Sequence, residues 1–163
     1  MPLGLAICHA VTAAAVLSLA LPAAAVQWAA PAPAGAQSIP ASQLIQPDEL
    51  NTMLHTKPAE KPFILQVGAR VMFAQAHIPG SVYAGAASQD SGAQQLRARV
   101  AQLPHNTFIV IYCGCCPWSR CPNVGPAYSL LASMGFTRVK VLYIADNFGA
   151  DWVNKGYPVE SGQ

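Results

Sequence analysis

Three strongly apolar runs, separated by helical patterns, constrain the fold of this chain more than any other feature. Their β-branched and aromatic residues are typical of strands that are buried on both faces, as parallel strands are. The runs are residues 63–67, 108–112 and 139–144. Between them, apolar residues recur at helical spacing, as at Leu96, Val100 and Leu103. Strands that alternate with helices predict an α/β fold in which a central parallel sheet has helices on both faces.

Residues at helix ends predict two further helices. Pro47, followed by two carboxylates, fits the first turn of a helix over residues 47–55. Another helix is expected over residues 124–134, with Asn123 as its N-cap and Gly135 just beyond its end.

The N-terminal segment predicts export from the cytoplasm. A long apolar stretch ends in three alanines, residues 23–25, which satisfy the small-residue pattern of a signal-peptide cleavage site. We therefore expect residues 1–25 to be a signal peptide, 26–43 a Pro- and Ala-rich linker and 44–161 the folded domain. The alternative is an uncleaved membrane anchor, although the apolar stretch reaches only the short end of what spans a bilayer. After cleavage the protein would be periplasmic or secreted and would not be held in a membrane.

Charge gives no indication of a macromolecular partner. The 163 residues carry a formal net charge of +2 without a run of Lys or Arg. The chain therefore lacks the basic surface that nucleic acids or anionic membranes attract. We expect small-molecule partners, and the sequence does not indicate an oligomeric state.

Four of the five cysteines lie in the segment CGCCPWSRC, from Cys113 to Cys121, directly after the strand expected at 108–112. In open α/β sheets, ligands bind where loops leave the carboxyl ends of strands and enter helices. Backbone N–H groups and the helix dipole stabilise a thiolate there, and the thiolate is the reactive form of cysteine. Cys113 is therefore the candidate nucleophile, and Arg120 is a candidate for binding an anionic substrate.

Over residues 44–160 the chain resembles a rhodanese-like domain. LIQPDELNTML resembles the start of that domain, and FILQVGARVMFAQAHIPGSVYAG resembles its signature, whose His-Ile-Pro-Gly sequence begins here at His77. A strand that ends in Tyr-Cys at Cys113, a helix that ends in Gly-Phe at Gly135, and the closing stretch DWVNKGYPVE follow in the order typical of the family.

The resemblance implies a sulfurtransferase that needs no cofactor. Its loop cysteine would take sulfane sulfur from a donor such as thiosulfate, carry it as a persulfide and pass it to a thiol or cyanide. Cys113 would be the carrier, and Arg120 with the loop amides would hold the donor. One or more of Cys115, Cys116 and Cys121 would resolve the intermediate, which leaves a disulfide for a reductant protein to reduce.

The chain departs from the family pattern at three positions. Gln66 and Gly68 stand where the family has Asp and Arg, which predicts that the usual polar support beneath the signature is absent. Asn123 stands where an Arg at the start of the helix belongs, and the loop before it is longer than usual.

Two assignments of the nucleophile follow from the longer loop. The end of the strand favours Cys113, whereas the family's spacing of four residues between Cys and Arg is met by Cys115 and Arg120. We prefer Cys113, because a strand fixes a residue more rigidly than an extended loop does.

Other uses of the four cysteines stay open. Several thiols in one loop can exchange disulfides, which would make the chain a thiol-disulfide redox protein, although a C-x-x-C spacing is missing. The thiolates of Cys113, Cys115, Cys116 and Cys121 are also soft ligands that suit a Cu(I)- or Zn-binding module. Purely structural disulfides are disfavoured, because they would close only short loops.

Overall fold

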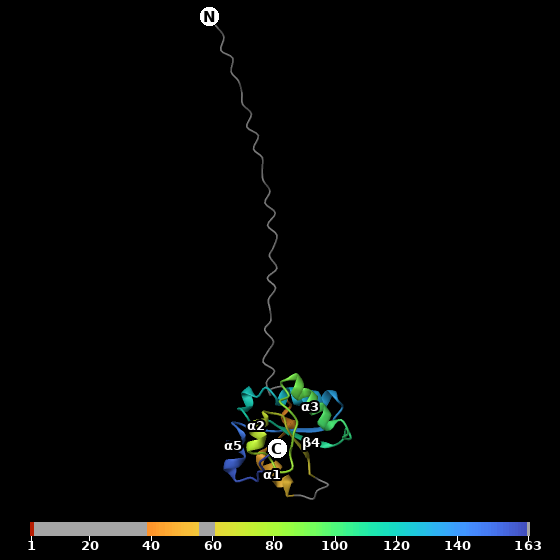
Figure 1. Cartoon of the computed structure of the whole chain (residues 1–163). Helices are drawn as coiled ribbons and strands as arrows, with labels where there is room; N and C mark the ends of the chain where they lie inside the picture. Colours follow the sequence, from red (N-terminus) through yellow and green to blue (C-terminus); the bar gives the residue numbers. More distant parts are fainter. Residues whose placement is uncertain (2–38, 56–60, 163) are drawn as a thin grey trace. The chain divides into compact units, whose positions relative to one another are not determined.

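The predicted central parallel sheet is confirmed. The computed structural model describes residues 1, 39–55 and 61–162, and in them five parallel strands form one sheet in the order β1-β5-β4-β2-β3 (Figure 1). The strands are β1 (Leu44–Ile45), β2 (Phe63–Gln66), β3 (Val82–Tyr83), β4 (Phe108–Tyr112) and β5 (Arg138–Leu142).

Helices connect these strands, and three of them coincide with the helices expected from the sequence. The α-helices are α1 (Pro47–Leu54), α2 (Arg70–Gln75), α3 (Asp90–Val100), α4 (Val124–Ser133) and α5 (Phe148–Asp151). Short 3-10 turns are η2 (Ala41–Gln43), η4 (Trp118–Arg120) and η5 (Val153–Lys155). α1, α3 and α4 match the expected helices to within a few residues, whereas β3, α2 and α5 are too short to show a hydrophobic period.

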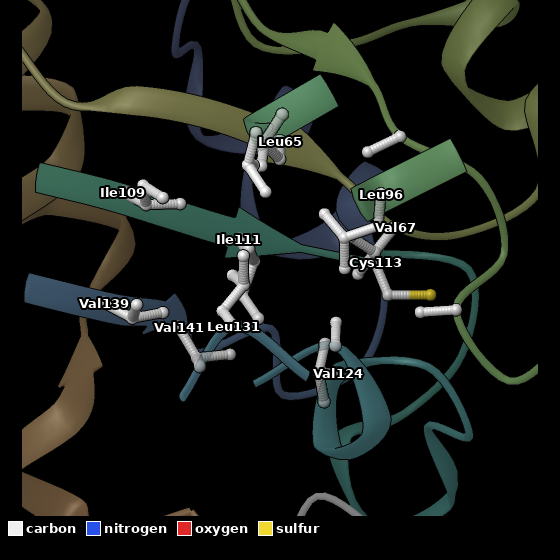
Figure 2. Packing of buried hydrophobic residues seen from close by; sticks show 14 of the residues in the cluster. Leu65, Val67, Leu96, Ile109, Ile111, Cys113, Val124, Leu131, Val139 and Val141 are labelled. Atoms are coloured by element: carbon white, nitrogen blue, oxygen red, sulfur yellow. The ribbon is translucent and has the colours of Figure 1, made fainter. Parts of the chain in front are cut away.

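The two faces of the sheet bury two separate hydrophobic cores. Leu65, Ile109 and Ile111 face the first core, where they pack with residues of α3 and α4 (Figure 2). Ile64 and Val110, their neighbours along the strands, face the second core with residues of α1 and α5. The expected arrangement of helices on both faces is therefore confirmed, and Figure 1 shows α3 and α1 on opposite sides of the sheet.

The connections after β2 and β4 leave the sheet on opposite faces. β2 leads through α2 to β3 on one side, whereas β4 leads through α4 to β5 on the other. Such a reversal opens a crevice at the carboxyl ends of the two strands, which is where open α/β sheets bind ligands. Gly68, after β2, and Cys113, after β4, lie at this point.

All the described strands and helices lie within one unit, residues 31–163. The predicted signal peptide lies outside the described residues except for Met1. The predicted linker also lies outside them except for its last residues, 39–43, where Ile39 is buried in the first core. In the part of the chain that the structure describes, no helix combines the length and the apolarity needed to cross a membrane.

Candidate functional site: a cluster of four thiols

The cysteine loop starts as a sharp turn at the end of β4. Cys113 is buried, with 3% of its surface exposed, and Gly114 follows with a left-handed φ of 75°. The Gly114 carbonyl accepts a hydrogen bond from the Phe148 N–H at 2.9 Å, and a Cβ at Gly114 would lie 2.8 Å from the Phe148 Cβ. Both the φ angle and the lack of space therefore require glycine here.

The side chains of the four predicted site cysteines converge. The Cys113 Sγ lies 3.0 Å from the Cys115 Sγ, which lies 3.6 Å from the Cys116 Sγ. Cys121 lies beside them, because it and the Cys113 and Cys116 thiols shift one another's pKa values. All four are free thiols, with Cys113 and Cys121 buried and Cys115 exposed. We call these four side chains the sulfur cluster.

Asn123 links the sulfur cluster to the start of α4. Its Nδ2 donates to the Cys113 Sγ at 3.4 Å, and its Oδ1 accepts from the Ser88 N–H at 3.0 Å. Asn123 occupies the N-cap position, as the sequence predicts, but its side chain makes no capping bond to the helix. The expected capping role is therefore wrong, because both polar groups of the side chain have other partners.

Gln66 supplies polar support beneath the loop. Its side chain is 2% exposed; Nε2 donates to the Cys113 carbonyl at 3.2 Å, and Oε1 accepts from the Gly68 N–H at 3.2 Å. The sequence-based expectation that such support is absent is wrong, because an amide can donate and accept at the same time. Gly68 leaves room for this arrangement, since a Cβ there would lie 2.8 Å from the Cys113 Sγ.

The thiols shift one another's pKa values in opposite directions. Hydrogen bonding from Cys113 lowers the pKa of Cys115 to about 6, although burial opposes the shift. Cys113 also lowers the pKa of Cys121, and the backbone N–H groups of Asn123 and Val124 lower it further, although burial opposes the shift. The interaction with Cys115, followed by that with Cys121 and by burial, strongly raises the pKa of Cys113. Negative charge is therefore favoured first on Cys115 and Cys121, with Cys113 in its protonated form.

A small cavity of about 170 Å³ adjoins the loop on the side of α2 and α5. Its wall includes Gln66, Cys113 and Gly114 together with apolar side chains such as Met72 and Phe148. None of the described residues that line it is Lys or Arg. The cavity therefore suits a small, mostly apolar group better than a free dianion.

Arg120 is exposed and does not line this cavity. Its backbone carbonyl lies 3.9 Å from the Cys116 Sγ, so the residue belongs to the loop, but it is not brought together with the cavity beside Cys113. Trp118, in the same 3-10 turn, packs against Tyr143 with ring centroids 5.0 Å apart. The backbone N–H of Trp118 donates to the Ala145 carbonyl. These contacts fix the outer part of the loop to the segment after β5.

The sulfur cluster is also the place where the described residues could hold a metal ion. The Sγ atoms of Cys113, Cys115 and Cys116 all lie within 4.8 Å of one another. Thiolates are ligands for soft cations such as Cu(I) and Zn.

Sequence reasoning found all four cysteines but missed the residues that position them. Gln66 and Gly68 were noted only as departures from a family pattern, and Asn123 only as such a departure and as a helix N-cap. A signal was present, since Gln66 is a polar residue at the end of an otherwise apolar strand. Its partner, the Cys113 carbonyl, lies 47 positions further along the chain, so the contact itself depends on the pairing of β2 with β4.

A doubly wound parallel sheet with a buried free cysteine at a central strand end defines an α/β protein with a cluster of thiols at its topological switch point. Comparison with known families identifies the class more closely. The family model described as the rhodanese-like domain matches residues 46–143, which is more than half of the chain. The chain therefore belongs to the rhodanese-like domain family, a family of the sulfurtransferase type.

Solved structures agree with this fold. The crystal structure of the Alr3790 protein from Anabaena sp. is 23% identical, with a TM-score of 0.56, over 72% of this chain and 92% of that chain. The BH2092 protein from Bacillus halodurans is 21% identical, with a TM-score of 0.57, over 74% of this chain and 77% of that one. Wild-type EanB is 19% identical, with a TM-score of 0.51, over 73% of this chain but only 27% of its own length. A search of curated proteins finds no match.

Proposed function

We propose that this chain is an exported sulfurtransferase that carries sulfane sulfur as a persulfide on Cys113. The observation that carries the proposal is the position of the Cys113 Sγ at the switch point of the sheet, with Asn123 Nδ2 at 3.4 Å and the Cys115 Sγ at 3.0 Å. A donor beside the sulfur stabilises a thiolate, and a neighbouring sulfur can accept the proton that the thiol must lose.

The first step loads the sulfur atom. The Cys115 thiolate takes the Cys113 proton as the Cys113 sulfur attacks the terminal sulfur of a donor R–S–SH. The new S–S bond gives Cys113–S–SH, and the donor leaves as RS⁻. No net oxidation occurs, because one sulfur–sulfur bond forms as another breaks.

The cavity favours an organic hydropersulfide as the donor. Its described lining is largely apolar and without a cation, so a thiosulfate dianion would lose hydration there without a charged partner. Arg120 lies outside this lining. Its predicted role in holding an anionic donor therefore remains a proposal, and it applies only if the donor is thiosulfate.

In this proposal Cys115 resolves the persulfide, which the 3.0 Å separation of its Sγ from the Cys113 Sγ supports. When its thiolate attacks the inner sulfur, a Cys113–Cys115 disulfide forms and hydrosulfide leaves; an external dithiol then reduces the disulfide and is itself oxidised. Attack on the terminal sulfur by an external thiol or cyanide instead returns Cys113 directly to a thiolate. Cys116 and Cys121 are further candidates for resolving thiols. The Cys116 Sγ lies 3.6 Å from the Cys115 Sγ, and Cys121 is close enough to Cys113 for its pKa to be lowered by that thiol.

The proposed export places these thiols in an oxidising compartment, periplasmic or extracellular. This proposal is supported by the sequence pattern of residues 1–25. A reductant protein would then be needed as a partner to keep the sulfur cluster in its thiol form.

Intact mass spectrometry tests the loading step. Reduced full-length chain is incubated separately with an organic hydropersulfide and with thiosulfate, beside Cys113→Ser and Cys115→Ser. We expect a gain of one sulfur atom in wild type that is faster with the hydropersulfide, is lost in Cys113→Ser, and is slowed but retained in Cys115→Ser. Loss of loading in Cys115→Ser with retention in Cys113→Ser would move the nucleophile to Cys115.

A thiol-disulfide redox protein is the second candidate, favoured by the 3.0 Å separation of the Cys113 and Cys115 sulfurs. It predicts reversible formation of a Cys113–Cys115 disulfide with a dithiol substrate and no uptake of sulfur from any donor. Mapping the disulfide by mass spectrometry after mild oxidation distinguishes the two functions.

A further inference from the structure

We infer that the sulfur cluster, in its fully reduced form, binds one Cu(I) ion through Cys113, Cys115 and Cys116, with Cys121 as an additional sulfur beside the ion. This binding activity is separate from sulfur transfer, since it requires no donor and no persulfide. It uses the same cysteines as thiolate ligands of a metal ion.

The spacing of the sulfurs supports a single ion. With metal–sulfur bonds of about 2.3 Å, sulfurs that surround one ion lie about 3.8 to 4.0 Å apart. The Cys113–Cys115 and Cys115–Cys116 Sγ separations are 3.0 and 3.6 Å, and all three sulfurs lie within 4.8 Å of one another. Movements of about an ångström or less, well within the reach of a side-chain torsion, would therefore complete the ligand set.

An N–H group beside the sulfurs offsets part of the charge that thiolate ligands bring. The side-chain Nδ2 of Asn123 donates to the Cys113 sulfur at 3.4 Å. Such outer partners orient metal ligands and strengthen metal binding.

The number of sulfurs that lie close together favours Cu(I) over Zn. Structural zinc is almost always held by four ligands in a tetrahedron, whereas only three of these sulfurs lie within 4.8 Å of one another. Thiolates select soft ions, and Cu(I) is softer than Zn. Cys113 and Cys121 are buried, whereas Cys115 is exposed and Cys116 partly exposed, so a partner could deliver or remove the ion on the side of Cys115 and Cys116.

Anaerobic competition titration tests the inference. Reduced, metal-free full-length chain is titrated with Cu(I) in the presence of a chromophoric Cu(I) chelator, beside Cys116→Ser and, as a control in the same loop, Ser119→Ala. We expect one Cu(I) per chain in wild type and in Ser119→Ala. Cys116→Ser should lose more than about 100-fold in affinity, because changing only an outer partner already costs about 10- to 100-fold.

Thermal unfolding of each metal-free variant checks that Cys116→Ser, whose side chain is partly exposed, is folded. X-ray absorption of the loaded wild type should show a shell of sulfur ligands alone. Equal affinity of wild type and Cys116→Ser, binding of more than one ion, or tighter competition by Zn than by Cu(I) would each overturn the inference.

The result is independent of the proposed function. Sulfur loading is measured on metal-free protein, so failure to load with intact Cu(I) binding would remove the sulfurtransferase alone. Loading without Cu(I) binding would remove the metal site alone. If both hold, one equivalent of Cu(I) should block sulfur loading, since the ion occupies the Cys113 thiolate.

Discussion

At the scale of single residues, the site is built by neutral amides that surround a cysteine. Gln66 holds the Cys113 carbonyl, and Asn123 donates to the Cys113 sulfur. Both are buried among apolar residues, where an unpaired amide would cost free energy. Their hydrogen bonds therefore hold the Cys113 backbone and sulfur at the end of β4.

Asn123→Ala should slow sulfur loading and destabilise the fold. Hydrogen bonds to charged groups contribute about 1.5 to 3 kcal/mol, and the contact to sulfur at 3.4 Å is long. We therefore expect loading of Cys113 to slow by about tenfold, the lower end of that range. Stopped-flow loading with a hydropersulfide and urea unfolding measure the two effects. Asn123→Asp, which keeps an acceptor for Ser88 but faces the sulfur with a carboxylate, should load more slowly than Asn123→Ala; faster loading would contradict this role.

Gly68→Ala should disturb the nucleophile directly. The new Cβ would lie 2.8 Å from the Cys113 Sγ and 2.9 Å from Gln66 Nε2, and overpacking of this kind costs about 1 to 3 kcal/mol. We expect lower stability in urea and slower sulfur loading together. Gly80→Ala is the control for loading, because its Cβ meets nothing within 4 Å. Its φ of 72° should cost stability through backbone strain alone, and loading should be unchanged.

At the scale of elements, the cysteine loop is held between β4 and α5. The Phe148 N–H donates to the Gly114 carbonyl, and the Trp118 N–H donates to the Ala145 carbonyl. Two points of the loop are thus attached to the segment that follows β5. This attachment explains how a loop longer than the family pattern can still bring four sulfurs together.

Gly114→Ala and Gly156→Ala separate backbone strain from packing at this contact. Both glycines have φ of 75°, but a Cβ at Gly114 would lie 2.8 Å from the Phe148 Cβ, whereas one at Gly156 meets nothing within 4 Å. Strain alone should cost about 1 to 2 kcal/mol in each variant. Gly114→Ala should cost at least about 1 kcal/mol more, from overpacking. Urea unfolding of the pair checks the difference, and equal losses would show that Phe148 moves aside freely.

At the scale of the whole domain, one sheet joins two cores. β2 sends Leu65 into the first core and Ile64 into the second, so neither core can lose its packing without disturbing the strand that both share. We therefore expect the domain to unfold as one cooperative unit.

Leu65→Ala tests this cooperativity. Leu65 is fully buried, and truncation of a buried Leu costs about 2 to 5 kcal/mol. Trp118 packs against the first core and Trp152 lies within the second. Variants that keep one of them, with Trp28 also replaced, therefore report on each face by fluorescence. The two transitions should shift together to lower urea; if only the Trp118 signal shifts, the cores unfold separately.

The sequence by itself determined the parallel α/β sheet, its three central strands and the four cysteines at the end of β4. Hydrophobic period and turn residues are local properties, so they can be read along the chain. The ends of the longer helices were also predicted closely, because Pro47 and Gly135 act within a few residues.

Only the tertiary structure decided how the cysteines are used. Gln66 supports the Cys113 carbonyl, and Gly68 leaves room for the Cys113 sulfur. Asn123, expected to cap α4, instead donates a hydrogen bond to that sulfur. All three depend on contacts between β2, β4 and the start of α4. The closeness of Cys121 to Cys113 likewise follows from the path of the loop around η4. The contacts of Gln66 and Gly68 with Cys113 join residues distant in the sequence, and they form only when strand pairing places the carboxyl ends of β2 and β4 side by side.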